Sequence, residues 1–315
     1  MDKGLLITNC FLRTDKFVEH YEWLSSAAHA RGITLDLWDN ASLPIWYGEQ
    51  ACSSLAEQMR PYQFVLYWDK DVRLGRYLML VCEGLDIPIY NSVEAMAVCD
   101  DKSETYRVLQ QWNEQAIHQR EQIPILPTIV APMTYTGIGY TNLDFLQNII
   151  HRLQFPMVIK ECFGSFGQQV HLISEEQSLR EWTMKLAGTP FLYQQYLHNS
   201  HGHDLRLQVV GDQVVAAMHR FSLSGDFRAN LTNGGQMESY VPSERECALA
   251  VRAVQALGLD FAGVDLLFSN GPDAEADVVC EVNSNAHFRN IAECTGVNVA
   301  EKIIEYIIGN KLSFL

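Results

Sequence analysis

The stretch 260–289, DFAGVDLLFSNGPDAEADVVCEVNSNAHFR, constrains the fold of this chain more than any other. Two apolar, β-prone runs, 261–268 and 278–282, flank a segment rich in Asn, Gly, Pro and Asp. This pattern predicts a β-hairpin. Each run carries one carboxylate among apolar neighbours, Asp265 in the first and Glu281 in the second.

The spacing of these polar residues predicts a cation site. Glu281 and Asn283 are two positions apart, so on a strand they point to the same face. Pairing of the two strands can bring Asp265 to that face, and three oxygen-bearing side chains suit a hard cation such as Mg²⁺ with phosphate oxygens completing its shell. A buried carboxylate without a partner is costly, which favours a bound cation. Taken alone, the pattern also fits a strand pair whose acids face solvent.

The bulk composition limits the class of protein. The chain has 315 residues, which suggests two or three structural units, each with its own core. Its net charge of −15 argues against binding along a phosphate backbone, so we expect no nucleic-acid partner. No apolar run is long enough to span a bilayer, and residues 1–12 are typical of a first strand rather than a signal peptide. We therefore expect a cytoplasmic protein with no membrane partner.

The Cys and His residues give little support to a structural metal site. None of the eight cysteines lies in a C-x-x-C pair and their spacings are wide, so we expect scattered, mostly buried free thiols in a reducing compartment. Three histidines, His198, His201 and His203, share a Gly-containing loop. Without a Cys partner, an exposed loop explains them more simply than a metal does.

Strand and helix patterns alternate in the first hundred residues. Strands are expected at 3–9, 33–38, 64–68 and 87–90. Helices are expected at 17–30, 49–59 and 73–83. This alternation predicts a parallel-sheet α/β domain, which we place at 1–95.

The rest of the chain mixes helices with strand pairs. Helices are expected at 92–97, 102–112, 143–153, 175–187, 243–257 and 297–308, the last ended by Gly309. Strands are expected at 156–160, 170–173, 191–197, 205–210 and 214–221, before the hairpin described above. We divide this part into a small lobe with a central linker, 96–190, and a C-terminal lobe, 191–315.

Residues 155–173 are a first candidate for phosphate binding. Lys160 ends an apolar strand, and Gly164 and Gly167 bracket the turn to the return strand. Glycines let backbone N–H groups approach a phosphate closely, and a lysine at the mouth adds a point charge. The stretch matches neither a Walker loop nor a dinucleotide fingerprint, so by itself a plain hairpin with an exposed lysine explains it better than a phosphate site does.

Two other stretches are ambiguous in the same way. Asp101 and Lys102 stand at a helix start, where an aspartate can simply cap the helix. Arg206, Arg220 and Arg228 lie on or beside consecutive strands of an acidic chain. Arginine is the usual residue for recognising phosphate or carboxylate, although surface ion pairs would also explain the three.

Taken in order, these pieces resemble one family. The order is a D-K pair at a helix start, a strand-Lys-Gly loop, a Q-x-Y hinge, D-[IL]-R, V-V-G-x-x-V-V-A-A-M-x-R, G-D-F-R-x-N-x-x-x-G-G, G-V-D and E-V-N-S. Each motif is weak alone, but the ordered set is specific, and residues 204–283 carry it almost without gaps. The chain resembles the ATP-grasp superfamily, most closely the RimK-like carboxylate–amine ligases.

The resemblance implies an α/β (α+β ATP-grasp) fold in which two lobes with antiparallel sheets sandwich ATP. The residues that it assigns to ATP are Lys102, Lys160, Gly164, Ser165, Gly167, Gln195, Tyr196, Asp204, Arg228 and Asn230. In these relatives the two lysines contact phosphates and the Gly-containing loop covers them. Gln195 and Tyr196 would form the hinge beside adenine, and Asp204 would bind the ribose.

The resemblance also implies a metal and a reaction. Asp265, Glu281 and Asn283 would hold Mg²⁺, with two ions expected and Mn²⁺ as an alternative metal. Arg220 and Arg228 would be catalytic, meeting the γ-phosphate and an acyl-phosphate intermediate. Phosphorylation turns a carboxylate into an electrophile, an amine then attacks, and ADP and phosphate are released; the protein contributes positioning and charge neutralisation.

We therefore expect an ATP-dependent ligase that joins a carboxylate to an amine, adding an amino acid such as glutamate to a peptide, a protein tail or a small acceptor. A homo-oligomer is compatible with the sequence. The alternatives are another ATP-grasp chemistry, thioester-forming or carboxylase-like, and a non-catalytic nucleotide-binding protein.

Three departures from the family pattern bear on the substrates. Residues 285–287, Asn-Ala-His, replace a Pro-Gly turn that is common after E-V-N-S. Gln195 stands where an acidic residue is common, and Phe166 and Gln168 make the phosphate loop less rich in glycine. These changes leave ATP use in place and leave the substrates open, with the segment 285–289 as the expected acceptor side.

Overall fold

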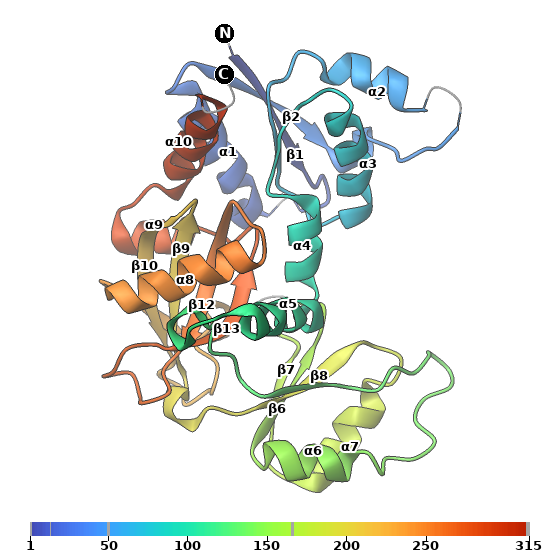
Figure 1. Ribbon diagram of the computed structural model, residues 1–315, viewed down its shortest axis with the longest axis vertical. Coiled ribbons are helices and arrows are strands. Elements are labelled where there is room, and N and C mark those ends of the chain that lie inside the picture. The colour runs from blue at the N-terminus through green and yellow to red at the C-terminus, as the bar shows by residue number, and fades with distance from the viewer. Residues whose placement is uncertain (1, 13, 49–50, 165–166, 313–315) are drawn as a thin grey trace.

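The structure, a computed structural model, describes residues 2–12, 14–48, 51–164 and 167–312. Its elements form three tiers, each built around one β-sheet, with α4 (Val93–Asp100) and α5 (Lys102–Gln115) running along one side between them (Figure 1). Within the described residues, no helix is both long enough and apolar enough to cross a membrane.

The first tier is a four-stranded sheet flanked by helices. Its strands are β1 (Asp2–Thr8), β2 (Ile33–Asp39), β3 (Val65–Tyr67) and β4 (Ile89–Tyr90). Its helices are α1 (Asp15–His29), α2 (Ala51–Met59) and α3 (Val72–Glu83). The strands are parallel in the order β2-β1-β3-β4, which confirms the predicted parallel sheet. The chain leaves β1 toward one side and returns to β3 on the other, so the loops after β1 and β3 flank a topological switch point, where open α/β sheets bind ligands.

The middle tier is a five-stranded antiparallel sheet. Its strands are β9 (His203–Val210), β10 (Gln213–Phe221), β11 (Gln236–Ser239), β12 (Phe261–Leu267) and β13 (Val278–Asn283), in the order β11-β10-β9-β12-β13. Helix α8 (Glu244–Ala256) covers one face of the sheet, where alternate strand residues such as Leu205, Leu207 and Val264 form a core with it. The opposite face carries the charged residues.

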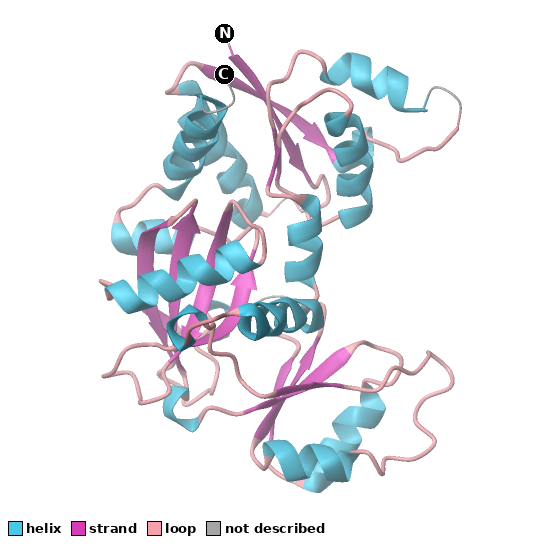
Figure 2. Cartoon of the chain, viewed as in Figure 1, coloured by secondary structure: helices cyan, strands magenta, loops and turns pink. Residues whose placement is uncertain are grey.

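The third tier is a four-stranded antiparallel sheet. Its strands are β5 (Thr128–Val130), β6 (Met157–Glu161), β7 (Val170–Ile173) and β8 (Phe191–Gln195), in the order β5-β8-β6-β7. Helices α6 (Leu146–Leu153) and α7 (Glu176–Lys185) pack on it around a separate core (Figure 2). Together with the middle tier it forms the expected pair of antiparallel sheets.

The C-terminal helices lead back to the first tier. Helix α9 (Arg289–Thr295) contacts β10 and β11, and α10 (Val299–Leu312) packs against α1. Ile303, Ile304 and Ile307 share a core with Leu24 of α1 and Phe261 of β12, so one apolar core joins the first and middle tiers. The domain boundaries given above stay a prediction.

Several sequence-based expectations were wrong in detail. Helix α10 does not end at Gly309; the residue keeps a helical conformation, and the described helix continues to Leu312. Two short strands and α9 were not expected, because sequences such as QMES in β11 carry no clear periodic pattern. The thiols are all free, but only Cys82 and Cys162 are buried, and the other six are half-buried.

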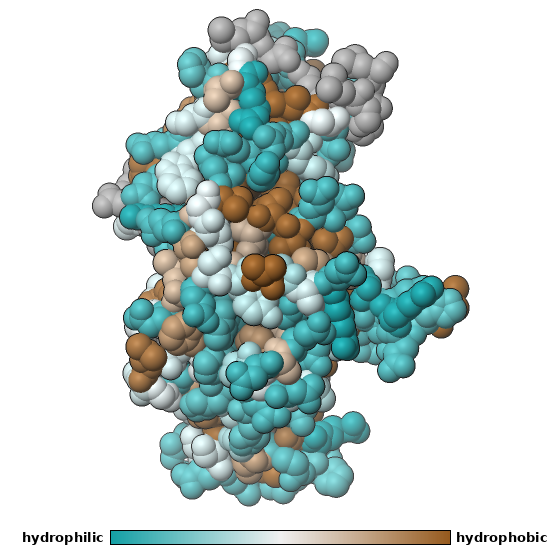
Figure 3. Space-filling model, turned by 90° about the vertical axis from the view of Figure 1, so that its left-hand side faces the viewer, coloured by the Kyte–Doolittle hydropathy of each residue, from teal (hydrophilic) through white to brown (hydrophobic). Residues whose placement is uncertain are grey.

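The face seen in Figure 3 is largely hydrophilic, with apolar side chains gathered at mid-height.

Candidate active site

A ladder of opposite charges crosses the face of the middle sheet that α8 leaves uncovered. Residues alternate between faces along a strand, so Asp204 and Arg206 of β9 lie opposite the core residues Leu205 and Leu207. The register places Arg220 of β10 beside Asp204. It places Asp265 of β12 between Arg206 and Glu281 of β13, as the predicted hairpin required.

The arginines of this ladder hold both buried aspartates. Arg220 donates two hydrogen bonds to Asp204, at 2.6 and 2.8 Å, and its Nη2 also lies 3.0 Å from Asp265 Oδ1. Arg206 donates to both oxygens of Asp265, through Nε to Oδ1 and through Nη2 to Oδ2 at 2.7 Å. Such bidentate pairs fix both side chains in register and orientation.

The two aspartates respond to burial in different ways. Burial raises the pKa of Asp204, and the nearby Arg220 only partly opposes this. Burial also disfavours the charged form of Asp265, but the guanidiniums of Arg206 and Arg220 outweigh it and lower its pKa. The ladder therefore favours the ionised form of Asp265, at its centre, more than that of Asp204.

A β-bulge adds a residue that the sequence did not reveal. The pairing of β12 with β13 shifts between Asp265 and Leu266, so Cys280 has no partner opposite it. Val279 and Val282 lie in the core under α8, whereas Cys280 and Glu281 both line the charged side. The bulge thus places a thiol next to Glu281.

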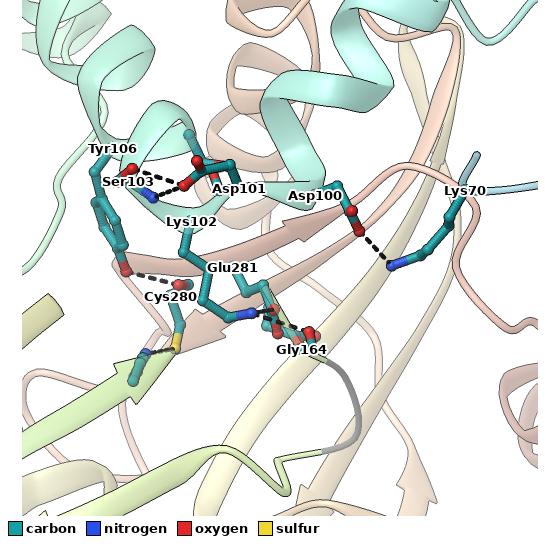
Figure 4. Close-up of polar contacts among 12 residues, drawn as sticks. Lys70, Asp100, Asp101, Lys102, Ser103, Tyr106, Gly164, Cys280 and Glu281 are labelled. Atoms are coloured by element: carbon teal, nitrogen blue, oxygen red, sulfur yellow. Dashed lines mark hydrogen bonds and ion pairs between the residues drawn. The ribbon is translucent and has the colours of Figure 1, made fainter. Parts of the chain in front are cut away.

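A smaller cavity, of about 120 Å³, lies between the middle and third sheets. Lys160 of β6 is 8% exposed there, with its Nζ 3.6 Å from Cys280 Sγ. Lys102 donates from Nζ to the carbonyl of Gly164 at 3.0 Å and lies 3.4 Å from Glu281 Oε1 (Figure 4). Lys102 of α5 and Lys160 of β6 therefore contact two adjacent residues of β13, Glu281 and Cys280.

Lys102 lies at a capped helix start, so the capping explanation of Asp101 is confirmed, and the phosphate role of Lys102 stays a prediction. Asp101 is the N-cap of α5 and accepts from the backbone N–H of Ser103 at 2.9 Å. The cap orients the first turn so that Lys102 points toward Gly164 and Glu281 (Figure 4).

The Gly-containing loop is held from both sides. Lys102 binds the carbonyl of Gly164, and Arg228 Nη1 donates to the carbonyl of Gly167 at 2.7 Å. Arg228 is itself paired with Asp226 at 2.8 Å. Ser165 lies outside the described residues.

The predicted hinge lines the far end of the smaller cavity. Gln195 and Tyr196 both border it, as does Gln194, which sequence reasoning did not select. Gln194 is buried and donates to Thr128 Oγ1 at 2.8 Å, a contact with β5 that only the fold brings about.

The nearby histidines pair with protein groups. His201 bonds to the hydroxyl of Tyr196, and His203 lies 3.0 Å from His219, which bonds to Glu238. Across the described part of the chain, no group of three His, Cys, Asp or Glu side chains is placed to hold a metal ion. His198 and His201 are exposed, whereas His203 is half-buried at the start of β9.

A larger cavity, of about 430 Å³, lies on the other side of the ladder, between the middle sheet and the first tier. Glu281 and Asn230 line both cavities, so the two meet at these residues. Arg206, Arg220 and Asn283 line the larger cavity, whereas Asp204 and Asp265 line the smaller one.

Residues 285–287, which depart from the family pattern, form part of the larger cavity. Asn285 donates from Nδ2 to the carbonyl of Tyr67 at 3.1 Å, and His287 packs against the rings of Phe17 and His20. An added Cβ at Gly263 would lie 2.6 Å from the Cβ of Ala286, so glycine at this position lets the turn approach the sheet.

The predicted metal ligands lie together but are not equally free. Glu281 is a third exposed and faces both cavities, and Asn283 follows it along β13. Asp265 already accepts from two guanidiniums. Glu281 therefore fits a hard cation best, with Asp265 able to join it only if an arginine moves.

Comparisons with known proteins decide the family. A family model described as the RimK-like ATP-grasp domain matches residues 99–307. The chain belongs to the RimK-like ATP-grasp family. This confirms the resemblance drawn from the ordered motifs, and the fold matches as well.

Two curated relatives cover most of the chain. An uncharacterised MG012 homologue of Mycoplasma pneumoniae is 31% identical over 77% of this chain and 79% of its own length. A probable alpha-L-glutamate ligase of Pasteurella multocida is 31% identical over 76% of this chain and 71% of its own length. The expected enzyme class, an ATP-dependent C–N ligase, agrees with the second name.

Solved structures share the whole fold. The ATP-grasp ligase PsnB, complexed with a minimal precursor, superposes with a TM-score of 0.69 at 18% identity, covering 98% of this chain and 99% of its own. Another PsnB structure, complexed with a precursor variant, Mg and ADP, gives a TM-score of 0.65 at 16% identity, with 98% of both chains covered.

Proposed function

We propose that this family member is an ATP-dependent carboxylate–amine ligase that forms an amide bond and releases ADP and phosphate. One observation carries the proposal: two cavities meet at Glu281 and Asn230 on a charged sheet face. A smaller cavity rich in cationic side chains suits a nucleotide, and the larger one suits the groups to be joined. Phosphoryl transfer would take place where they meet.

The smaller cavity supplies the cations that phosphoryl transfer needs. We assign Lys102, Lys160 and Arg228 to the phosphates, because all three line it and stand beside the loop that Gly164 and Gly167 bracket. Fixed positive charges act most strongly in a site shielded from water and need no reorganisation during the reaction. Gln195 and Tyr196 would border the base, and Asp204 the ribose.

We place Mg²⁺, with two ions as the family resemblance implies, at Glu281, Asn283 and Asp265. Such an ion neutralises charge on the transferring phosphoryl group and orients it. The carboxylate and amide donors of this set are those that Mg²⁺ prefers. Arg206 and Arg220 lower the pKa of Asp265, and one of them would have to move for its carboxylate to bind the ion.

The larger cavity would hold the acid and the amine. A carboxylate arriving near Glu281 and Asn230 would meet Arg220 and Arg206, which line that side. Their positive charge would stabilise the acyl phosphate and the oxyanion that develops when the amine attacks. We propose that the enzyme adds an amino acid such as glutamate to a peptide, a protein tail or a small acceptor. We also propose that it works in the cytoplasm, a reducing compartment that suits its eight free thiols.

Product analysis tests the proposal. Purified protein is incubated with MgATP and acid–amine pairs, including glutamate with peptides, and the nucleotide products are separated. We expect ADP and phosphate in a pair-dependent manner, and a hydroxamate when hydroxylamine replaces the amine. Release of AMP, or a thioester with coenzyme A as the sole product, would refute the ligase mechanism. A lack of Mg²⁺-dependent ATP binding would favour a non-catalytic role instead.

A further inference from the structure

We propose that the larger cavity recognises a substrate through its primary ammonium group, held by Asp69 and Asn285. This inference rests on the proposed function, which brings an amino acid or peptide to this cavity. It starts from two acceptor oxygens that the protein holds in place and leaves without a donor.

The first oxygen belongs to Asp69, in the loop after β3. The residue is 4% exposed, and its Oδ1 accepts from Asn9 Nδ2 at 3.1 Å and from the backbone N–H of Lys70 at 2.7 Å. Its Oδ2 is buried and has no hydrogen-bond partner among the described residues. Leaving a carboxylate oxygen buried and unpaired is costly, so a donor is expected there.

The side chains next to Asp69 in the loops after β1 and β3 do not donate to its Oδ2. Lys70 turns away to Asp100, 3.1 Å from its Nζ (Figure 4). Asp71 caps α3 and accepts from two backbone N–H groups of that helix. The side chain of Asn9 is fixed in its orientation, because its Oδ1 accepts from the N–H of Phe11 at 3.0 Å. Asp69 is therefore held in place but not neutralised.

The second oxygen is Oδ1 of Asn285. The amide donates from Nδ2 to the carbonyl of Tyr67, two residues before Asp69, and this bond sets which way the side chain faces. Oδ1 is buried and has no hydrogen-bond partner in the described structure. Both residues line the larger cavity, so two oriented acceptors stand near the end of β3.

Two acceptors without a donor select a group that only donates. A primary ammonium offers three N–H donors and a positive charge, and it accepts nothing. The position of this part of the cavity also suits a ligand. Asn9 and Asp69 follow β1 and β3, the strands that flank the switch point of the first sheet. Arg206 and Arg220 line the opposite wall, so a zwitterionic, amino-acid-like substrate would meet a matching charge at each end.

Binding measurements test the site without requiring turnover. The probes are the standard amino acids, each beside its des-amino analogue, titrated into protein saturated with Mg²⁺ and a non-hydrolysable ATP analogue. Wild type should bind at least one amino acid about 10- to 100-fold more tightly than its analogue, because a charge-assisted hydrogen bond is lost. In Asp69→Asn, which keeps shape and the bonds to Oδ1, this preference should fall below about twofold.

The matched control is Asp36→Asn, in the same sheet but outside the cavities, which should keep the wild-type preference. Asp69→Asn should also keep wild-type melting and nucleotide affinity, because Asp69 does not line the smaller cavity. The proposal is overturned if no amino acid is preferred over its analogue, or if the preference survives in Asp69→Asn. Either result leaves the ligase assignment, which ADP release decides, untouched.

Discussion

The two cavities differ in how far their polar groups are already satisfied. Around the smaller cavity, the proposed nucleotide side, Lys102, Lys160 and Arg228 contact loop carbonyls, a thiol and a carboxylate within the protein. On the substrate side, Asp69 and Asn285 each keep a buried oxygen without a donor among the described residues. Both cavities are lined by residues of the shared motifs, but Asn285 belongs to the segment in which this chain departs from them, and Asp69 lies outside those motifs. We therefore propose that substrate specificity resides where polar groups remain unpaired.

The largest expected effect comes from removing the carboxylate at the centre of the charge ladder. Asp265→Ala would leave Arg206 and Arg220 buried without their shared partner. Loss of one member of a buried ion pair costs about 3–5 kcal/mol, so the free energy of unfolding in urea should fall by that amount. Asp265→Ala with Arg206→Met should recover part of the loss, and a double variant no more stable than Asp265→Ala would show that the ladder is not coupled.

Glu281→Gln should affect turnover rather than folding. Glu281 is a third exposed and lies at the meeting point of both cavities, so its amide variant should fold normally. Loss of one charge-stabilising group typically costs about 100- to 1,000-fold in kcat, measured here as ADP release. The exposed Glu181→Gln on α7 serves as control, and wild-type turnover in Glu281→Gln would refute the site assignment.

Asn91→Ala should affect binding in the larger cavity more than binding in the smaller one. The buried amide of Asn91 bonds to the carbonyls of Phe261 and Ser284 and to the N–H groups of Asp260 and Phe261. Unpairing these groups should destabilise the protein by about 1–3 kcal/mol. Ser284 lines the larger cavity and not the smaller one. KM for the acid or amine should therefore rise more than KM for ATP. An equal rise in both would argue against separate sites.

The smallest expected effect is the change in protein stability with pH that comes from His203, which lines the smaller cavity. Burial, reinforced by His219, lowers the pKa of His203. The unfolded chain then binds the proton more readily, so this contribution to stability is complete above the ordinary histidine pKa of about 6.5 and is lost as pH falls below it. His203→Gln should therefore lose less stability than wild type between pH 7 and 5 in urea titrations. The exposed His198→Gln should behave like wild type.

Strand periodicity made much of the candidate site predictable. Glu281 and Asn283 were expected on one face with Asp265 because side chains alternate along a strand, and the register agrees. The bulge beside Asp265 could not be read from VVCEVN, so Cys280 was missed. Gln194 was missed for a similar reason, since its partner Thr128 lies on a strand too short to be recognised.

The sequence by itself determined the parallel first sheet, the paired antiparallel sheets and the family, because local patterns and ordered motifs lie within short stretches of chain. Tertiary structure alone decided that α10 returns to α1 and that Asp69 and Asn285 line one cavity. Both depend on contacts between residues far apart in the chain, which no local pattern records. Those contacts leave two buried oxygens of the larger cavity without a donor among the described residues. The ligand that we propose for this cavity is the one that would supply that donor.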